Sequence, residues 1–157
     1  MRIGDVKLSN PFILAPMAGI TDVAFRQLCK QYGAGLVCSE MISSEALVRG
    51  NEDTQKLMTS TKDEQPLSVQ IFGSDPQIMA EAAKIIEKKN KCSIIDINMG
   101  CPAQDIVRQG SGAGLLKNVD RACEVSQSVV DSVKLPVTVK IRIGIKHKIT
   151  AVETSRK

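Results

Sequence analysis

Short apolar runs alternate along this chain with segments of helical period, and this alternation limits the possible folds more than any other feature. The runs have the length of strands and cover residues 12–15, 36–38, 67–72, 94–97 and 137–142. They are almost continuously apolar, which is typical of strands that are covered on both faces. The alternation therefore predicts an α/β fold built on a parallel sheet.

Three segments between these runs are predicted to be helices. The first covers residues 25–32, where apolar residues recur at helical spacing behind cap candidates such as Asp22. The second opens at Asp75-Pro76, and the third follows Asn118. A hairpin over residues 2–8 is expected before them, and a last helix over residues 150–157 after them.

Two architectures carry such a sheet: a doubly wound open sheet and a TIM (β/α)8-type barrel. The segment Gly110-Ser111-Gly112-Ala113-Gly114 fails the dinucleotide-binding fingerprint, because Leu115 occupies the third glycine position and no strand immediately precedes it. The barrel is therefore favoured. Barrels of this type usually need ~200 residues or more, so about five parallel strands in 157 residues are expected to be an incomplete amino-terminal portion.

The composition excludes several classes of protein. With 43% hydrophobic and 24% charged residues, the chain is neither a disordered tail nor a membrane protein, and the cytoplasm is the expected location. The net charge of +4 is concentrated at the carboxyl end, so charge alone does not indicate RNA binding. The five cysteines form no C-x-x-C pair, and His147 is the single histidine, so we expect neither disulfides nor a metal site.

Polar and reactive residues gather where each predicted strand stops. In barrels the catalytic groups come from the carboxyl ends of several strands, so these residues are expected to converge on one active site. They are Pro16-Met17-Ala18-Gly19, Ser39-Glu40-Met41, Gln70, Asn98 to Cys101, and Lys140 with Arg142.

Each of these residues also has a structural interpretation. Gln70 could be a polar residue at a sheet edge, and Met17 could fill the core. Lys140 lies in a segment of the most buried kind, where an unpaired ammonium is costly, so a bound anion or polar ligand is expected beside it. Cys101 lies in a turn between Gly100 and Pro102, and both a functional and a structural role are open for it.

Four blocks of the sequence resemble the signature blocks of the tRNA-dihydrouridine synthases. They occur in the same order and at fitting separations, and the resemblance covers residues 1 to about 144. The blocks are Pro16 to Asp22, Gln70 to Gly73, Asp96 to Ala103, and Val137 to Arg142.

The resemblance implies an FMN-containing barrel that reduces the C5–C6 double bond of particular uridines in tRNA, with NADPH as the reductant of the flavin. Asn98 would hold the target uracil, and Cys101 would be the general acid that protonates C5. A helix starting just after Pro102 would work against that role by favouring the thiolate. The residues carried over as flavin contacts are Pro16, Met17 and Ala18 along the ring system and Gln70 and Lys140 as its hydrogen-bond partners.

The sequence also departs from the family pattern. After Gly144 the family usually continues with a Trp-Asp pair, whereas Ile145-Lys146 follows here, and Asp105 stands where a lysine is common. We expect residues 1–157 to be the amino-terminal part of the barrel domain, without the remaining strands and the C-terminal helical domain that grips tRNA. Two alternatives stay open: a catalytically silent half-barrel that self-associates through its unpaired edges, and another FMN barrel such as a dihydroorotate dehydrogenase-like enzyme.

Overall fold

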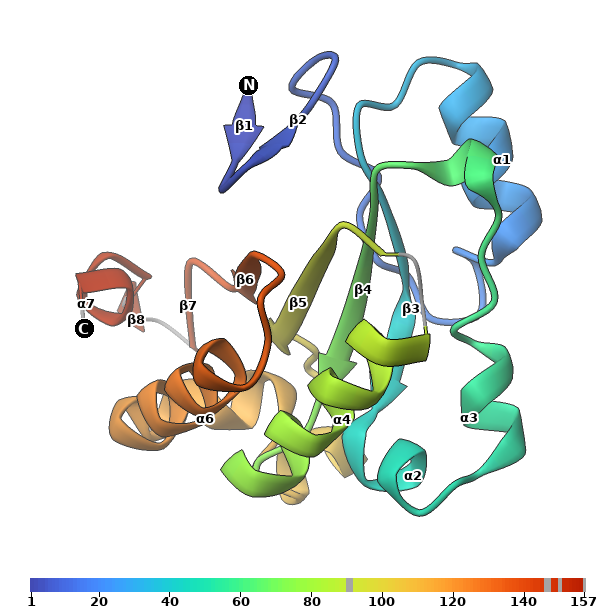
Figure 1. Cartoon of the computed structure of the whole chain (residues 1–157). Helices are drawn as coiled ribbons and strands as arrows, with labels where there is room; N and C mark the ends of the chain where they lie inside the picture. The colour runs from blue at the N-terminus through green and yellow to red at the C-terminus, as the bar shows by residue number, and fades with distance from the viewer. Residues whose placement is uncertain (90–91, 146–147, 150, 157) are drawn as a thin grey trace.

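A four-stranded parallel sheet forms the centre of the molecule (Figure 1). The computed structural model describes residues 1–157 except 90–91, 146–147, 150 and 157. The predicted α/β class is confirmed, and the sheet is that of an incomplete (β/α)8 barrel. In spatial order its strands are β3 (Val37–Ser43), β4 (Leu67–Phe72), β5 (Ile94–Met99) and β6 (Val137–Ile141).

The three predicted helices are present as α1 (Val23–Gln31), α4 (Pro76–Lys89) and α6 (Val119–Ser132). Asp22 caps α1 by accepting a hydrogen bond from the Phe25 amide at 2.8 Å. Several shorter elements were not predicted because each holds few residues of helical period: α2 (Ser44–Val48), α3 (Glu52–Lys56), η1 (Lys62–Glu64), α5 (Gln104–Arg108) and η2 (Gly112–Lys117).

The carboxyl-terminal segment forms a small hairpin and a helix. The strands β7 (Gly144–Ile145) and β8 (Lys148–Ile149) pair with each other, and α7 covers Ala151–Arg156. The predicted helix over residues 150–157 is thus present in its described part, while its two end residues and His147 lie outside the described residues.

The strand predictions were wrong in two respects. Residues 12–15 do not form a strand but make one parallel bridge, between Ile13 and Leu36, so the sheet has four strands rather than five. Both β3 and β5 run further than their apolar runs, so Asn98 lies inside β5 rather than after it. The residues that extend these strands include polar ones, and polar side chains on one face of the sheet belong to the candidate site described below.

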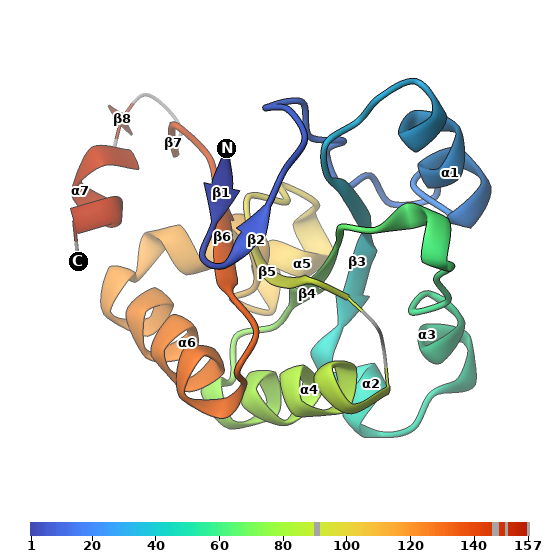
Figure 2. The ribbon, with the colours of Figure 1, turned by 45° about the horizontal axis from the view of Figure 1, so that its top comes forward.

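The other face of the sheet forms the hydrophobic core. Val69, Ile71, Ile95 and Ile97 are fully buried there, in one cluster with Met79 and other residues of α4 and α6. Burial of each such side chain stabilises the fold by roughly 1.5–3 kcal/mol. Figure 2 shows α4 and α6 lying side by side against the sheet.

A hairpin closes the amino-terminal end of the sheet. Its strands, β1 (Arg2–Ile3) and β2 (Val6–Lys7), are antiparallel, as predicted. Ile3 and Val6 pack on a second apolar cluster formed by Leu8, Leu36 and Ile94. In Figure 1 the hairpin lies near the starts of the strands, so the carboxyl ends are left for a binding site.

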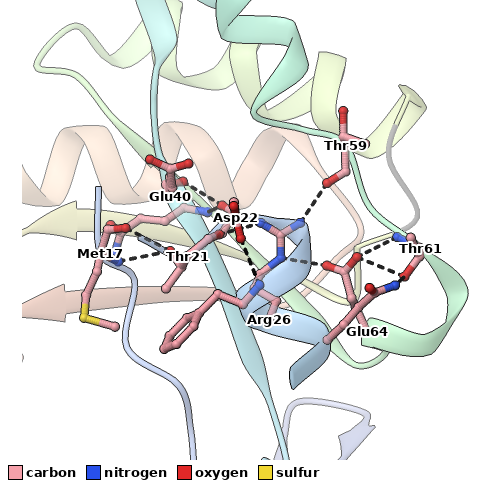
Figure 3. A network of polar contacts seen from close by, with 12 residues as sticks. Met17, Thr21, Asp22, Arg26, Glu40, Thr59, Thr61 and Glu64 are labelled. Carbon is pink, nitrogen blue, oxygen red and sulfur yellow. Dashed lines mark hydrogen bonds and ion pairs between the residues drawn. The ribbon is translucent and has the colours of Figure 1, made fainter. Parts of the chain in front are cut away.

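The helix α1 is held by a buried charge as well as by Cys29, the member of its apolar stripe that packs on the core. Leu28 and Tyr32, which were expected to belong to an apolar face, are 46% and 86% exposed, whereas Arg26 is 2% exposed. Arg26 Nε donates to Glu64 Oε2 at 2.6 Å, and its two terminal nitrogens donate to the carbonyls of Thr21 and Thr59 (Figure 3). The guanidinium thereby joins α1 to the preceding loop, through Thr21, and to the segment after α3, through Thr59 and Glu64.

Glu64 is equally well satisfied on its other oxygen. Its Oε1 atom accepts hydrogen bonds from the Thr61 amide at 2.8 Å and from the Thr61 hydroxyl at 3.0 Å. A buried ion pair stabilises a fold only when further hydrogen bonds satisfy its remaining polar atoms, and this pair meets that condition.

We predict that Arg26→Met strongly destabilises the chain, because it leaves the Glu64 carboxylate buried without its cation. The expected loss is about 3–5 kcal/mol in the free energy of unfolding, measured by urea denaturation. Lys56→Met is the matched control, since Lys56 pairs with Asp53 on the surface of α3. Exposed pairs contribute about 0–1 kcal/mol, so equal losses in the two variants would contradict the role given to Arg26.

Candidate active site

A cavity of about 230 Å³ lies at the carboxyl ends of the strands and brings most of the predicted site residues together. Of the seven residues carried over by resemblance, Met17 alone does not line the cavity, although both of its neighbours do. The lining consists of Pro16, Ala18, Met41, Gln70, Asn98, Gly100, Cys101, Pro102 and Lys140.

The loop that carries Pro16 and Ala18 is fixed at two points. At one, the Gly19 amide donates to Glu40 Oε2 on β3. At the other, the Met17 carbonyl accepts hydrogen bonds from the Thr21 amide at 3.0 Å and the Thr21 hydroxyl at 3.1 Å (Figure 3). Met17 is therefore a turn residue of this loop, and its backbone rather than its side chain contributes to the shape of the cavity.

An irregularity in β3 supports the adjoining wall. The pairing with β4 shifts between Cys38 and Met41, which face Ser68 and Gln70. Within the shift, the Ser39 hydroxyl accepts a hydrogen bond from the Gln70 amide at 3.0 Å. The irregular segment thus keeps Gln70 tied to β3, and it contains Glu40, which holds the loop.

Gln70 and Asn98 are joined by a short hydrogen-bond chain on the inner face of the sheet. Asn98 Nδ2 donates to Gln70 Oε1 at 2.9 Å, and Gln70 Nε2 donates to Asp96 Oδ2 at 2.6 Å. Asp96 also accepts from the Thr138 hydroxyl at 2.6 Å. The three side chains that form this hydrogen-bond chain, Gln70, Asp96 and Asn98, are all buried.

Sequence reasoning missed Asp96 as a site residue. It stands in the middle of the apolar run 94–97, where a lone carboxylate is unusual and could have been recognised by that position. Burial raises the pKa of Asp96, and the hydrogen bonds from Thr138 and Gln70 and the charge of Lys140 act in the opposite direction.

Cys101 is half-buried, lines the cavity and is held through its backbone. Its amide donates to Asn98 Oδ1 at 2.9 Å, and its carbonyl accepts from the Ala113 amide at 3.0 Å. Gly112 makes this contact possible, because a Cβ there would lie 2.9 Å from the Cys101 carbonyl oxygen. A helix does follow the cysteine, but α5 begins at Gln104 rather than directly after Pro102.

The expectation that Lys140 is buried was wrong. Lys140 and its neighbour Val139 are exposed, because β6 is the edge strand of the four-stranded sheet. Lys140 faces Asn98 across the β5–β6 pairing and lines the cavity. The expectation that Lys140 contacts a ligand therefore depends on its place in the cavity and not on the cost of burying an ammonium.

Other features of the described residues do not add to this site. Three larger cavities, of about 550, 390 and 320 Å³, lie beside residues 58–65, between α6 and α7, and beside residues 12–14 and 29–34, and none is lined by a residue carried over by resemblance. In the described part of the chain, no group of three or more His, Cys, Asp or Glu residues could hold a metal ion.

The five cysteines are all free. Across the residues that the structure describes, none of the helices has the length and hydropathy needed to cross a membrane.

Comparison with known proteins identifies the family. The family model for dihydrouridine synthase (Dus) matches residues 13–157. The chain is 46% identical over 144 residues to tRNA-dihydrouridine synthase B of Pseudomonas syringae pv. tomato, and 46% identical to that of Shewanella oneidensis. It is 44% identical over 145 residues to a protein named probable tRNA-dihydrouridine synthase of Rickettsia bellii.

These alignments cover 92% of this chain in each case. The chain belongs to the dihydrouridine synthase family. It spans 42–44% of the length of these curated relatives.

We predict that Gly112→Ala destabilises the chain and displaces the Cys101 loop, because the new Cβ would overlap the Cys101 carbonyl and the Ile106 side chain. Gly110→Ala is the control: Gly110 also has a positive φ, but a Cβ there would lie 3.5 Å from its nearest neighbour. Overpacking costs about 1–3 kcal/mol, so thermal unfolding should show the larger loss for Gly112→Ala. Equal losses would show that strain in φ alone accounts for both.

Proposed function

We propose that this chain carries the catalytic part of an FMN-dependent tRNA-dihydrouridine synthase, which reduces the C5–C6 double bond of uridine with NADPH as the electron donor. The cavity at the strand ends is the observation that carries this proposal. It places an amide pair, an ammonium and a thiol around one space, and each has a role in the reduction. Residues 1–157 would form the amino-terminal part of the barrel domain.

The residues present fit a flavin. The ring system of FMN is planar and carries carbonyl oxygens and ring nitrogens along one edge, which need hydrogen-bond donors. Gln70 and Lys140 offer N–H donors at the cavity, while Pro16 and Ala18 offer apolar surface for the plane of the ring. When bound, FMN that has been reduced by NADPH supplies the hydride for C6 of the uracil.

Asn98 and Cys101 would act on the uracil. Asn98 has an amide N–H that contacts only the Met41 sulfur, at 3.6 Å, so a uracil carbonyl could replace this weak acceptor. The Cys101 thiol would act as the general acid and donate the proton to C5. Cys101 is half-buried and lines the cavity, so a base that enters the cavity could contact it.

A tRNA substrate places further demands on the protein. A uridine in folded RNA must leave its stack to reach the cavity, which costs a few kcal/mol that contacts elsewhere on the RNA offset. The relatives named above are longer than this chain, and such contacts would come from additional surface. A tRNA substrate also favours the cytoplasm as the location.

We predict that Cys101→Ala leaves FMN binding unchanged but slows uridine reduction by roughly 10²–10⁴-fold, the usual contribution of a general acid. FMN binding would be measured by the quenching of flavin fluorescence, and dihydrouridine by mass spectrometry of digested tRNA. Cys123→Ala is the matched control, because Cys123 is a half-buried cysteine on α6 outside the cavity.

Unchanged turnover in Cys101→Ala would refute the acid assignment. A wild-type chain that binds no FMN would favour the catalytically silent half-barrel. Turnover of a free pyrimidine acid without any reduction of tRNA would favour a dihydroorotate dehydrogenase-like enzyme.

We further propose that two copies of the chain associate through the sheet edges. Val139 on the edge strand β6 is 40% exposed, and on the opposite side Phe12 and Ile13 are 73% and 42% exposed. An edge strand presents unpaired backbone groups that favour pairing with another chain. A twofold axis along the strands would set β6 of one copy beside residues 12–13 of its partner.

Light scattering coupled to size-exclusion chromatography tests this association, and we expect a dimer for the wild type. Val139→Lys should shift it toward the monomer, because a charge would then face the apolar edge of the partner. Val152→Lys is a control on the exposed side of α7, where Val152 is 62% exposed. A monomeric wild type at the highest soluble concentration would contradict the association.

A further inference from the structure

Asp96 is a buried carboxylate to which the reaction proposed above gives no part. It lies on the inner face of β5 and is 7% exposed. The sheet register sets it opposite Gln70 on β4 and Thr138 on β6, and each of its oxygens accepts one hydrogen bond of 2.6 Å from these residues.

A carboxylate can only accept hydrogen bonds, so it determines how its neighbours are oriented. Gln70 must present its NH₂ group to Asp96, which turns Gln70 Oε1 toward Asn98. Asn98 must then present its own NH₂ group to Gln70, which turns Asn98 Oδ1 toward the turn that follows β5. Every donor in this chain thus points toward Asp96.

The hydrogen-bond chain from Asp96 ends at the backbone of Cys101. Asn98 Oδ1 accepts hydrogen bonds from the amides of Gly100 at 3.0 Å and Cys101 at 2.9 Å. These two bonds hold the backbone of the turn on which the Cys101 side chain stands. If Asn98 were reversed, its NH₂ group would face two backbone N–H groups, and neither bond could form. The orientation set at Asp96 is therefore transmitted to Cys101.

The same orientation determines what the cavity offers a ligand. The amide groups of Gln70 and Asn98 have their oxygens engaged inside the protein, so only N–H groups remain for a bound molecule. Lys140 adds a cationic donor. The cavity is thus matched to the acceptor edge of a planar imide or amide ring, the chemistry shared by a flavin and a uracil.

Keeping Asp96 in this place has an energetic cost. Burial raises its pKa, which means that ionised Asp96 is less stable in the folded state than in the unfolded chain. The groups that face it are Gln70 on β4, Thr138 and Lys140 on β6, and Cys38 on β3, whose pKa burial and the charge of Asp96 raise to about 12. A carboxylate kept at such a cost beside a cavity is a candidate for a functional role.

We propose that Asp96 is a positioning residue, whose carboxylate fixes the donor direction of the chain Asp96–Gln70–Asn98 and thereby places the cavity's N–H groups and the Cys101 turn. The meaning of this arrangement for catalysis rests on the proposed function. The hydrogen-bond chain itself does not, and it can be tested without flavin or tRNA.

A pH titration of the ¹⁵N-labelled wild-type chain followed by NMR is the first test. On going from neutral to acidic pH, the side-chain NH₂ signals of Gln70 and Asn98 and the backbone amides of Gly100 and Cys101 should shift with one common midpoint. Because burial raises the pKa of Asp96, that midpoint should lie above the ordinary value for an aspartate. Separate midpoints, or no shift while the protein stays folded, would overturn the proposal.

The variant Asp96→Asn tests the origin of this midpoint. Its amide can donate to Gln70 Oε1 and so allows the chain to reverse, so the common midpoint should disappear and the Gly100 and Cys101 signals should move. Cys38→Ala is the matched control, because Cys38 is buried near Asp96 but makes no hydrogen bond to Gln70 or Asn98. It should keep the midpoint, and a midpoint that persists in Asp96→Asn would assign it to another group.

Stability provides a readout of the charge itself. A raised pKa in the folded state favours folding below the unfolded-state pKa, and this contribution is lost as the pH rises through the folded-state value. As the pH falls through the pKa of Asp96, the free energy of unfolding of the wild type should therefore rise relative to that of Asp96→Asn. A constant difference between the two proteins across this range would contradict a costly charge at Asp96.

Measuring FMN affinity tests whether the hydrogen-bond chain from Asp96 to Asn98 matters for the proposed function. A reversed Gln70 would present an oxygen to acceptor atoms of the ring, so Asp96→Asn should weaken FMN binding by about tenfold, the loss of one hydrogen bond. If the wild type bound no FMN, the proposed function would fail while the NMR result would still decide the role of Asp96. If FMN bound equally to both proteins, Asp96 would not position the flavin contacts.

Discussion

The parallel register of β3 to β6 is the constraint on which the rest of the structure depends. It sets Gln70 beside Asp96, Asp96 beside Thr138 and Asn98 beside Lys140 on one face of the sheet. The residues between them, such as Val69 and Ile97, then face α4 and α6 and are fully buried. A slip of one residue would exchange the two faces, so the core and the candidate site are fixed by the same pairing.

The loop that carries Pro16 and Ala18 has no regular structure and is held by charged side chains instead. Glu40 holds the Gly19 amide, and Arg26 holds the Thr21 carbonyl through a guanidinium that is itself paired with Glu64. Both carboxylates come from elements that follow the loop in sequence. The wall formed by Pro16 and Ala18 is therefore positioned only once β3 and the segment around η1 have packed against α1.

The sequence predicted the α/β alternation and the three long helices. It also predicted that the residues at the strand ends converge, and six of the seven residues carried over by resemblance line one cavity. These features follow from local periodicity and from short motifs, which are encoded by neighbouring residues. The resemblance to the dihydrouridine synthases, seen in four separate blocks, is confirmed by the family match over residues 13–157.

Other features depend on contacts between residues that are distant in the sequence, and they could not be predicted from it. The apolar run at 94–97 did not indicate that β5 continues through Asn98. A buried Asn98 is stable in the strand because it hydrogen-bonds to Gln70 on β4, and this contact cannot be read from the sequence. The exposure of Lys140 follows from the edge position of β6, and the burial of Arg26 follows from Glu64, 38 positions away. Asp96 was missed although its position inside the apolar run 94–97 could have revealed it.

Adding FMN to the ¹⁵N-labelled protein, followed by NMR, tests most directly whether the carboxyl ends of β4, β5 and β6 form a flavin site. The account predicts that the amide signals of Gln70, Asn98, Cys101 and Lys140 shift together and saturate with one affinity. Signals from the cavity between α6 and α7, such as that of Gln127, should stay in place. Saturable shifts at α6 and α7 with none at the strand ends, or no shifts at all, would contradict it.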